Sequence, residues 1–284
     1  MKPAAFAYAK ARSLDHAIEL LGSRGGARLL AGGQSLIPAL NMRLDAPPLL
    51  VDINGLGGLD RIDVTDGTVE IGALVRQAAA LRSAPLAQHA PLVARALPHI
   101  AHPAIRNRGT IGGSIAYADP AAELPACLLA LSGEVEAAGS HGRRRIEAND
   151  FFLGLFETAL RPDEIIVNIR VPAATPDRRY GFAELARRQG DYALVGLAAC
   201  ARAEEGGLRE TRLVYFGVGA TPVRAREAEA VLDAKGFAGL DDAVAALARD
   251  LDPEDEIHAS GKSKKHLAGV LLRRVAAEMQ DPWA

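Results

Sequence analysis

The first part of the chain alternates short apolar runs with segments whose apolar residues recur at helical spacing. The apolar runs at 3–8, 28–31 and 49–53 predict three strands. Leu14, Ile18 and Leu21 predict a helix with Ser13 as its N-cap, and Ser35 is expected to cap a second, short helix through Met42. Strands and helices in this order predict a small lobe over residues 1–55.

The pattern over residues 56–174 predicts a second lobe. Runs at 61–65 and 68–71 flank Asp66-Gly67, a strong hairpin signal. Helices are expected near 75–81 and 91–100, strands at 135–138 and 165–171, and a loop at 102–108. Asp119-Pro120 predicts a turn, and Pro125 is expected to begin the next helix.

A Pro-rich segment, 172–177, predicts a linker. Beyond it, strands are expected at 180–185, 193–202 and 208–218, and helices at 223–232, 241–250 and 262–279. Strands followed by helices indicate a separate α+β domain over 178–284.

Composition narrows the functional classes. Hydrophobic residues make up 49% and charged residues 24% of 284 residues, as in an ordinary globular protein. A formal net charge of −2 argues against nucleic acid as the main partner, because no excess of Lys and Arg is present to neutralise phosphates. The densest basic run, Arg143-Arg144-Arg145, fits a solvated hairpin tip, with a docking patch as the alternative.

Cysteine usage and motifs exclude further classes. Cys127 and Cys200 lie in apolar surroundings and are expected to be buried free thiols. Two cysteines cannot hold an iron–sulfur cluster with four Cys ligands, and no CxxC or HExxH motif suggests a protein-bound metal. His99 and His102 are expected to be satisfied or solvent-facing side chains. With no signal peptide and no apolar run of about 18 residues, we expect no membrane span and a cytoplasmic location.

Two glycine pairs, each followed by a small hydroxyl residue, carry the candidate chemistry. The first is Ala31-Gly32-Gly33-Gln34-Ser35, and the second lies within residues 106–114, RNRGTIGGS. Glycines allow a left-handed backbone and close approach of a ligand, and successive N–H groups in such a turn can form an anion-binding nest. Either pair alone also fits an ordinary surface turn, whereas two such nests suit a ligand with two linked phosphates.

Both pairs belong to longer strings, AGGQSLIPALNMRL and HPAIRNRGTIGGSIAYADPAAELPACLLAL. These strings resemble the FAD-binding medium subunit of the molybdenum hydroxylases, the xanthine dehydrogenase and carbon monoxide dehydrogenase group. The resemblance covers nearly the whole chain. It implies an α+β fold: a two-lobe FAD-binding domain of the vanillyl-alcohol oxidase (PCMH) type over 1–174, then a C-terminal domain of the carbon monoxide dehydrogenase flavoprotein type over 178–284, with an antiparallel sheet and helices.

The resemblance implies which residues hold the cofactor. The first motif would bind the FAD pyrophosphate at the start of the Ser35 helix, where N–H groups and the helix dipole favour anions. The second would wrap the other side of FAD, with hydroxyls that donate to phosphate or ribityl oxygens. The string departs from the family pattern at Ala104, where a glutamine often stands. The residues of the two motifs assigned to the cofactor are Ala31, Gly32, Gly33, Gln34, Ser35, Leu36, Gly109, Thr110, Ile111, Gly112, Gly113 and Ser114.

Three further residues are assigned through the resemblance, each with an alternative. Asp119 contacts the cofactor or acts as an N-cap before Pro120. Glu123 accepts hydrogen bonds from cofactor hydroxyls or is a solvated acid. Tyr192 covers the isoalloxazine ring or packs in the core at the start of a strand. Arg106 either touches FAD or holds its loop.

The implied activity is electron transfer. The chain would bind FAD non-covalently, accept electrons from a 2Fe–2S subunit, and pass them to an external acceptor, while a third subunit carries the molybdenum cofactor. No residue of this chain would be catalytic for the substrate, because the flavin supplies the chemistry and the substrate binds elsewhere. The alternatives are a free-standing flavin oxidase or dehydrogenase of the vanillyl-alcohol oxidase fold, and a scaffold that has lost its flavin.

Overall fold

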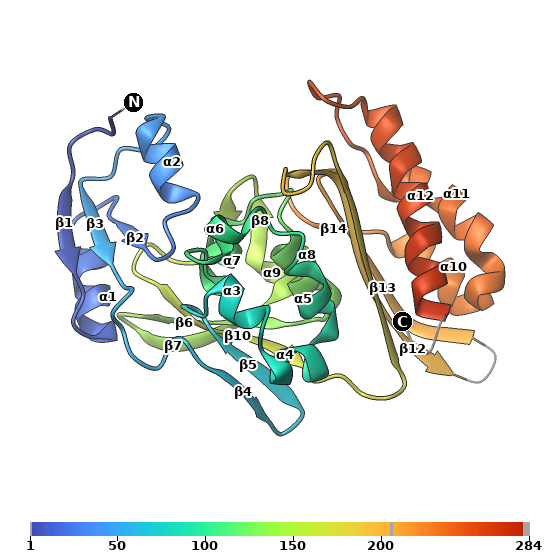
Figure 1. The fold of residues 1–284 in the computed structure, drawn as a ribbon, viewed down its shortest axis with the longest axis horizontal. Helices are drawn as coiled ribbons and strands as arrows, with labels where there is room; N and C mark the ends of the chain where they lie inside the picture. Colours follow the sequence, from blue (N-terminus) through green and yellow to red (C-terminus); the bar gives the residue numbers. More distant parts are fainter. Residues whose placement is uncertain (1, 205–206, 281–284) are drawn as a thin grey trace.

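The three larger sheets of the described residues lie side by side along the length of the molecule in the computed structural model, with helices between and beside them (Figure 1). The structure describes residues 2–204 and 207–280. Positions 1, 205–206 and 281–284, which fall within the predicted domains, lie outside the described residues. None of the helices in the described ranges is long and apolar enough to cross a membrane.

The first lobe is a parallel sheet in the order β1-β3-β2, with two helices. Its helix cap is confirmed, since the Ser13 hydroxyl accepts from the His16 N–H at 3.1 Å. The first strand begins later than predicted because its pairing with β3 starts only at Ala7. The elements are β1 (Ala7–Lys10), α1 (Leu14–Ser23), β2 (Arg28–Leu30), α2 (Leu36–Asn41) and β3 (Leu49–Asp52).

The second lobe is built on an antiparallel sheet in the order β4-β5-β10-β6-β7. Its predicted hairpin is confirmed, with Asp66 at φ 50° and Gly67 at φ 74° in the turn. The elements are β4 (Ile62–Thr65), β5 (Thr68–Gly72), α3 (Gln77–Ala80), α4 (Ala84–His89), α5 (Pro91–Ala96), α6 (Pro103–Arg106), α7 (Ile111–Tyr117), α8 (Glu123–Ala130), β6 (Glu134–Gly139), β7 (Gly142–Glu147), α9 (Ala148–Phe151), β8 (Phe152–Gly154), β9 (Glu157–Thr158) and β10 (Ile165–Pro172).

Three local predictions in this lobe are wrong. The segment 102–108 contains the short helix α6, which Pro103 begins, rather than only loop. Helix α8 begins at Glu123, two residues before Pro125, because proline is tolerated throughout a first helical turn. The basic run lies in strand β7 and not at a hairpin tip.

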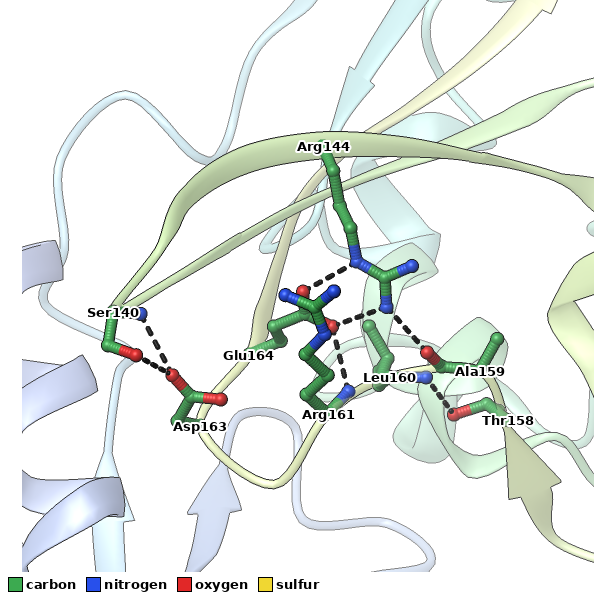
Figure 2. A network of polar contacts seen from close by, with 8 residues as sticks. All are labelled: Ser140, Arg144, Thr158, Ala159, Leu160, Arg161, Asp163 and Glu164. Atoms are coloured by element: carbon green, nitrogen blue, oxygen red, sulfur yellow. Dashed lines mark hydrogen bonds and ion pairs between the residues drawn. The ribbon is translucent and has the colours of Figure 1, made fainter.

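Strand alternation separates the side chains of the basic run. Arg143 lies beside Glu136, with 3.1 Å between Nη1 and Oε1, whereas Arg144 forms a two-pronged ion pair with Glu164 at 2.6 and 2.7 Å. Arg144 also donates to the Ala159 carbonyl at 2.6 Å. Figure 2 shows how this network ties the β6–β7 hairpin to the segment before β10. Arg144 is therefore a structural residue.

The C-terminal part is an antiparallel sheet in the order β11-β12-β13-β14 followed by helices. The predicted helix at 223 begins three residues later, because Val223 and Arg224 pair with β13 as a short strand. The elements are β11 (Arg178–Ala186), β12 (Ala193–Glu204), β13 (Gly207–Phe216), β14 (Val223–Arg224), α10 (Arg226–Lys235), the 3₁₀ helix η1 (Gly236–Gly239), α11 (Leu240–Asp250) and α12 (Gly261–Gln280).

The C-terminal sheet is covered on both faces, which explains the nearly continuous apolar sequence of β12. Helices α5 and α8 pack against one face and α10 and α12 against the other. Ala198 and Phe216 join the core of the second lobe, and Leu213 faces the C-terminal helices. Cys127 and Cys200 are buried free thiols, as predicted.

Candidate cofactor-binding site

The first glycine motif forms the turn between β2 and α2. Gly33 has φ 71°, the left-handed conformation that favours glycine. In the part of the chain that the structure describes, no hydrogen bond uses the backbone N–H groups of Gly33, Gln34 or Ser35. These three successive donors are the feature that an anion-binding turn requires.

Ser35 differs from its prediction. It precedes α2, but its side chain makes no capping hydrogen bond. Its backbone is already helical, with φ −103° and ψ −45°, whereas a side-chain cap requires an extended N-cap residue. Its hydroxyl therefore remains available to a ligand. Since α2 has only six residues, the site depends more on the turn's N–H groups than on a helix dipole.

The two glycine motifs touch each other. A Cβ atom on Gly32 would lie 2.4 Å from the Arg108 carbonyl oxygen and 2.8 Å from Gly109 Cα, closer than real Cβ atoms approach other heavy atoms. Only glycine fits there without moving one of the two backbones. Segments far apart in sequence thus form one continuous surface.

A polar chain braces this contact. Asn54 donates to the carbonyl oxygen of Ala31 at 2.9 Å and to the Asp52 carboxylate at 2.8 Å. Arg76 donates to Asn54 Oδ1 at 2.6 Å and to the carbonyl oxygen of Arg108. Arg76 and Asn54 therefore fix the separation of the two motifs. The sequence analysis missed both residues because neither belongs to a recognisable motif.

The second motif is not a second set of unpaired donors, and that prediction is wrong. Its N–H groups that already donate to protein acceptors are those of Gly109, Ile111, Gly112, Gly113 and Ser114. The Gly113 N–H bonds the Thr110 hydroxyl at 3.0 Å, which makes Thr110 the side-chain cap of α7. Among the described residues, no hydrogen bond uses the Thr110 N–H. This N–H and the hydroxyls of Thr110 and Ser114 are the donors left for a ligand.

The glycines of the second motif serve close packing. A Cβ on Gly109 would lie 2.5 Å from Gln77 Oε1, and one on Gly112 would lie 2.5 Å from Ala73 Cβ. Arg106 donates to the carbonyls of Ile100 and Ala101, at 2.6 and 2.9 Å, so the interpretation that it holds its loop is confirmed.

Helix α7 leads from the second motif to an acidic group. Asp119 lies two residues beyond the end of α7. It is not the N-cap of α8, because its carboxylate accepts from the Ala121 N–H at 2.9 Å and the helix starts later. Seven helical residues at about 1.5 Å each separate the two groups by about 10 Å. An elongated ligand can therefore reach both.

Tyr192 approaches the same place from the C-terminal domain. Gly190, at φ 85°, makes a tight turn against His102 that brings the segment to this edge. Burial of the Tyr192 hydroxyl, followed by the nearby charge of Asp119, raises the pKa of Tyr192 to about 12. The side chain is 67% exposed, so Tyr192 is not a core residue.

Two buried carboxyl groups lie in the same region. Glu123 is 9% exposed, so it is not a solvated acid. Burial, followed by the charges of Glu184 and Asp119, raises the pKa of Glu123 to about 8. Glu184 Oε2 is buried without a hydrogen-bond partner, while its Oε1 lies 3.5 Å from His99 Nδ1. The region thus holds a carboxyl whose raised pKa favours the protonated form, which can donate, and an acceptor that lacks a donor.

Comparison with known proteins also indicates a flavin-binding chain with two parts. Residues 4–174 match the family described as the FAD binding domain in molybdopterin dehydrogenase, and residues 180–279 match the CO dehydrogenase flavoprotein C-terminal domain. The chain is 41% identical over 282 residues to the 6-hydroxypseudooxynicotine dehydrogenase complex subunit alpha of Paenarthrobacter nicotinovorans, covering 98% of this chain and 95% of that protein.

Solved structures agree with the fold. Carbon monoxide dehydrogenase from Hydrogenophaga pseudoflava, in a form lacking the Mo-pyranopterin moiety, matches with a TM-score of 0.96 at 35% identity over 99% of both chains. Quinoline 2-oxidoreductase from Pseudomonas putida 86 matches with a TM-score of 0.93 at 34% identity over 98% of both chains. The chain therefore belongs to the family of FAD-binding medium subunits of the molybdenum hydroxylases, as its two glycine strings predict.

Proposed function

We propose that this chain is the FAD-carrying electron-transfer subunit of a heteromeric molybdenum hydroxylase. In this role it accepts electrons from a 2Fe–2S subunit and passes them to an external acceptor, while a third subunit carries the molybdenum cofactor and binds the substrate. Bound FAD supplies the redox chemistry. The observation that carries the proposal is the contact of the two glycine motifs, with three successive N–H groups unpaired beside it.

The residues present fit FAD. Gly33, Gln34 and Ser35 offer N–H groups to a pyrophosphate, and Gly32 keeps the surface free of a side chain. The adjoining residues, Ala31 and Leu36, shape the turn. From the second motif, only the Thr110 N–H and two hydroxyls donate, while Gly109, Ile111, Gly112 and Gly113 shape the surface that the cofactor would meet.

At the other end of α7, the acidic group suits the hydroxyl-rich part of the cofactor. Glu123 would donate a hydrogen bond to the cofactor when protonated, or accept one from a cofactor hydroxyl when ionised. Glu184 Oε2, which has no partner, would accept a hydrogen bond from a cofactor hydroxyl. Asp119 lies near the Tyr192 hydroxyl, and the exposed Tyr192 ring is placed to cover a flavin face and control access to it.

Relatives support the heteromeric setting. One is named as a subunit of a dehydrogenase complex, and another is the carbon monoxide dehydrogenase medium chain of Hydrogenophaga pseudoflava, 34% identical over all of this chain and 99% of that one. We take 1–174 as the FAD-binding domain and 178–284 as the C-terminal domain, and we place the assembly in the cytoplasm. Limited proteolysis at 172–177 and cell fractionation test these two assignments.

The experiment is purification of the chain from its native cell. We expect two other chains to co-purify, one with molybdenum and one with iron, and a flavin spectrum that heat or acid transfers to the supernatant as free FAD. Purification alone with substrate dehydrogenase activity would favour the free-standing oxidase. A chain without flavin that also fails to take up added FAD would favour the scaffold.

A further inference from the structure

A cavity of about 820 Å³ lies at the far end of α8 from the glycine motifs. Its walls are the end of α8 (130–132), the interdomain segment 172–177, the face of the C-terminal sheet that α8 covers and, past the β13–β14 edge of that sheet, the side of α10. Pockets for small organic molecules typically span about 300–1,000 Å³. None of the residues assigned to FAD lines it.

The sheet face of this cavity carries a group of arginines, most of them paired with carboxylates. Strand pairing sets Arg178 opposite Arg202, and Cys200 opposite Arg212, so the strands present arginines to the same side. Acidic residues neutralise some of them: Glu210 pairs with Arg178 and Arg202. The four arginines contributed by the strands, one from each, are Arg178, Arg202, Arg212 and Arg224.

Arg212 differs from the other three. Glu229 is the partner of Arg224, at 2.5 Å, and no carboxylate of the described residues forms an ion pair with Arg212. Arg212 Nη1 is buried without a hydrogen-bond partner. Burial and the neighbouring charge of Arg224 lower the pKa of Arg212. Arg212 is half-buried, and a guanidinium that has lost part of its hydration without gaining a counter-ion points to an anion from outside the chain.

A second unsatisfied polar atom lies on the same face of the sheet. Arg202, which strand pairing sets opposite Arg178, has its Nε buried without a hydrogen-bond partner. Buried polar groups in folded proteins are nearly always hydrogen-bonded, so two exceptions on neighbouring arginines of one cavity need a common cause. Guanidinium N–H groups only donate, so the missing partner is an acceptor.

We propose that this cavity is a binding site for a small organic anion, whose phosphate or carboxylate group is held by Arg212 and Arg202. Arginine recognises both groups through paired, charge-assisted hydrogen bonds. The volume exceeds what one inorganic phosphate fills, which leaves space for an organic part beside Tyr180 and Cys200. Because both domains contribute walls, an occupant would hold them together.

The test uses the full chain loaded with FAD, so that nucleotides cannot enter the flavin site. Inorganic phosphate, AMP and citrate serve as probes in thermal-shift and calorimetric titrations. We expect AMP or citrate to raise the melting temperature, and the better of the two identifies phosphate or carboxylate as the preferred group. Arg212→Met should weaken binding about tenfold or more, because charge-assisted hydrogen bonds are lost. Thr211→Val, beside Arg212 but on the opposite face of the sheet, should leave binding unchanged, as should Arg82→Ala at an exposed position.

The same variants test the unpaired charge without any probe. Arg212→Met should melt at the same or a higher temperature than the wild type, because it removes a half-buried charge that has no counter-ion. A clear fall in melting temperature would show a structural role and overturn the proposal. Equal binding by wild type and Arg212→Met, or no response to any probe, would also overturn it. If the isolated chain binds the probes but the assembled complex does not, a partner subunit fills the cavity and the small-molecule proposal is wrong.

Discussion

The contact between the two glycine motifs predicts that Gly32→Ala impairs FAD binding. The added methyl would start 2.4 Å from a backbone carbonyl oxygen, whereas ordinary contacts begin at 3.4 Å. The backbones must therefore separate by roughly 1 Å, since neither Arg108 nor Gly109 can yield by rotating a side chain. Overpacking of this kind costs about 1–3 kcal/mol.

If this free-energy cost applies to the arrangement of the two motifs that binds FAD, FAD should bind roughly five- to 150-fold more weakly. The assay is a titration of apoprotein with FAD by calorimetry or flavin fluorescence, with the melting temperature recorded in parallel. The matched control is Gly57→Ala, because a Cβ at Gly57 meets no atom within 4 Å. Equal FAD affinity in the wild type and Gly32→Ala would refute the idea that contact between the motifs builds the site.

Three further changes test other parts of the structure. Tyr192→Ala should alter the rate at which acceptors reoxidise the reduced subunit more than it alters FAD affinity. The rate is measured by stopped flow, with Tyr192→Phe, which keeps the aromatic ring, as the control. Glu123 has a folded pKa of about 8 against an ordinary 4.5, so its contribution to stability is present below pH 4.5 and is lost as pH rises toward 8. Glu123→Gln should therefore flatten the fall in melting temperature of the apoprotein over that range, and parallel curves would contradict the assignment. Arg144→Met leaves the buried Glu164 carboxylate short of donors and should destabilise the fold by about 1–3 kcal/mol in denaturant unfolding. Arg143→Met, at an exposed pair, should cost less than about 1 kcal/mol.

Local sequence signals predicted much of the fold. Ser13 and the Asp66-Gly67 turn act within a few residues, and the structure confirms both. The strands of the C-terminal sheet were predicted because long apolar runs reflect burial on both faces. Boundaries were wrong where tertiary pairing intervened, as at Val223, which joins a strand edge instead of a helix.

The sequence predicted the two glycine motifs of the candidate site but not the contacts that they make. A glycine in a motif suggests that another group approaches the backbone closely, but the sequence does not identify that group. The N–H groups of Ile111 and Gly112 donate to the carbonyls of Val75 and Ala73, so long-range pairing uses the donors that the motif suggested were unpaired. Arg76 acts through contacts with distant residues and leaves no local pattern. Glu184 belongs to no sequence motif either, and its candidate role rests on one carboxylate oxygen that is buried without a hydrogen-bond partner.

The most direct test of the electron-transfer role is anaerobic mixing of the FAD-loaded chain with its chemically reduced iron–sulfur partner. The visible absorbance of oxidised flavin is followed in time, and the external acceptor is then added. We expect the flavin absorbance to fall on mixing and to recover with the acceptor, and the FAD-free chain should pass no electrons. Flavin that stays oxidised beside the reduced partner, or equal transfer to the acceptor without FAD, would contradict the proposed function.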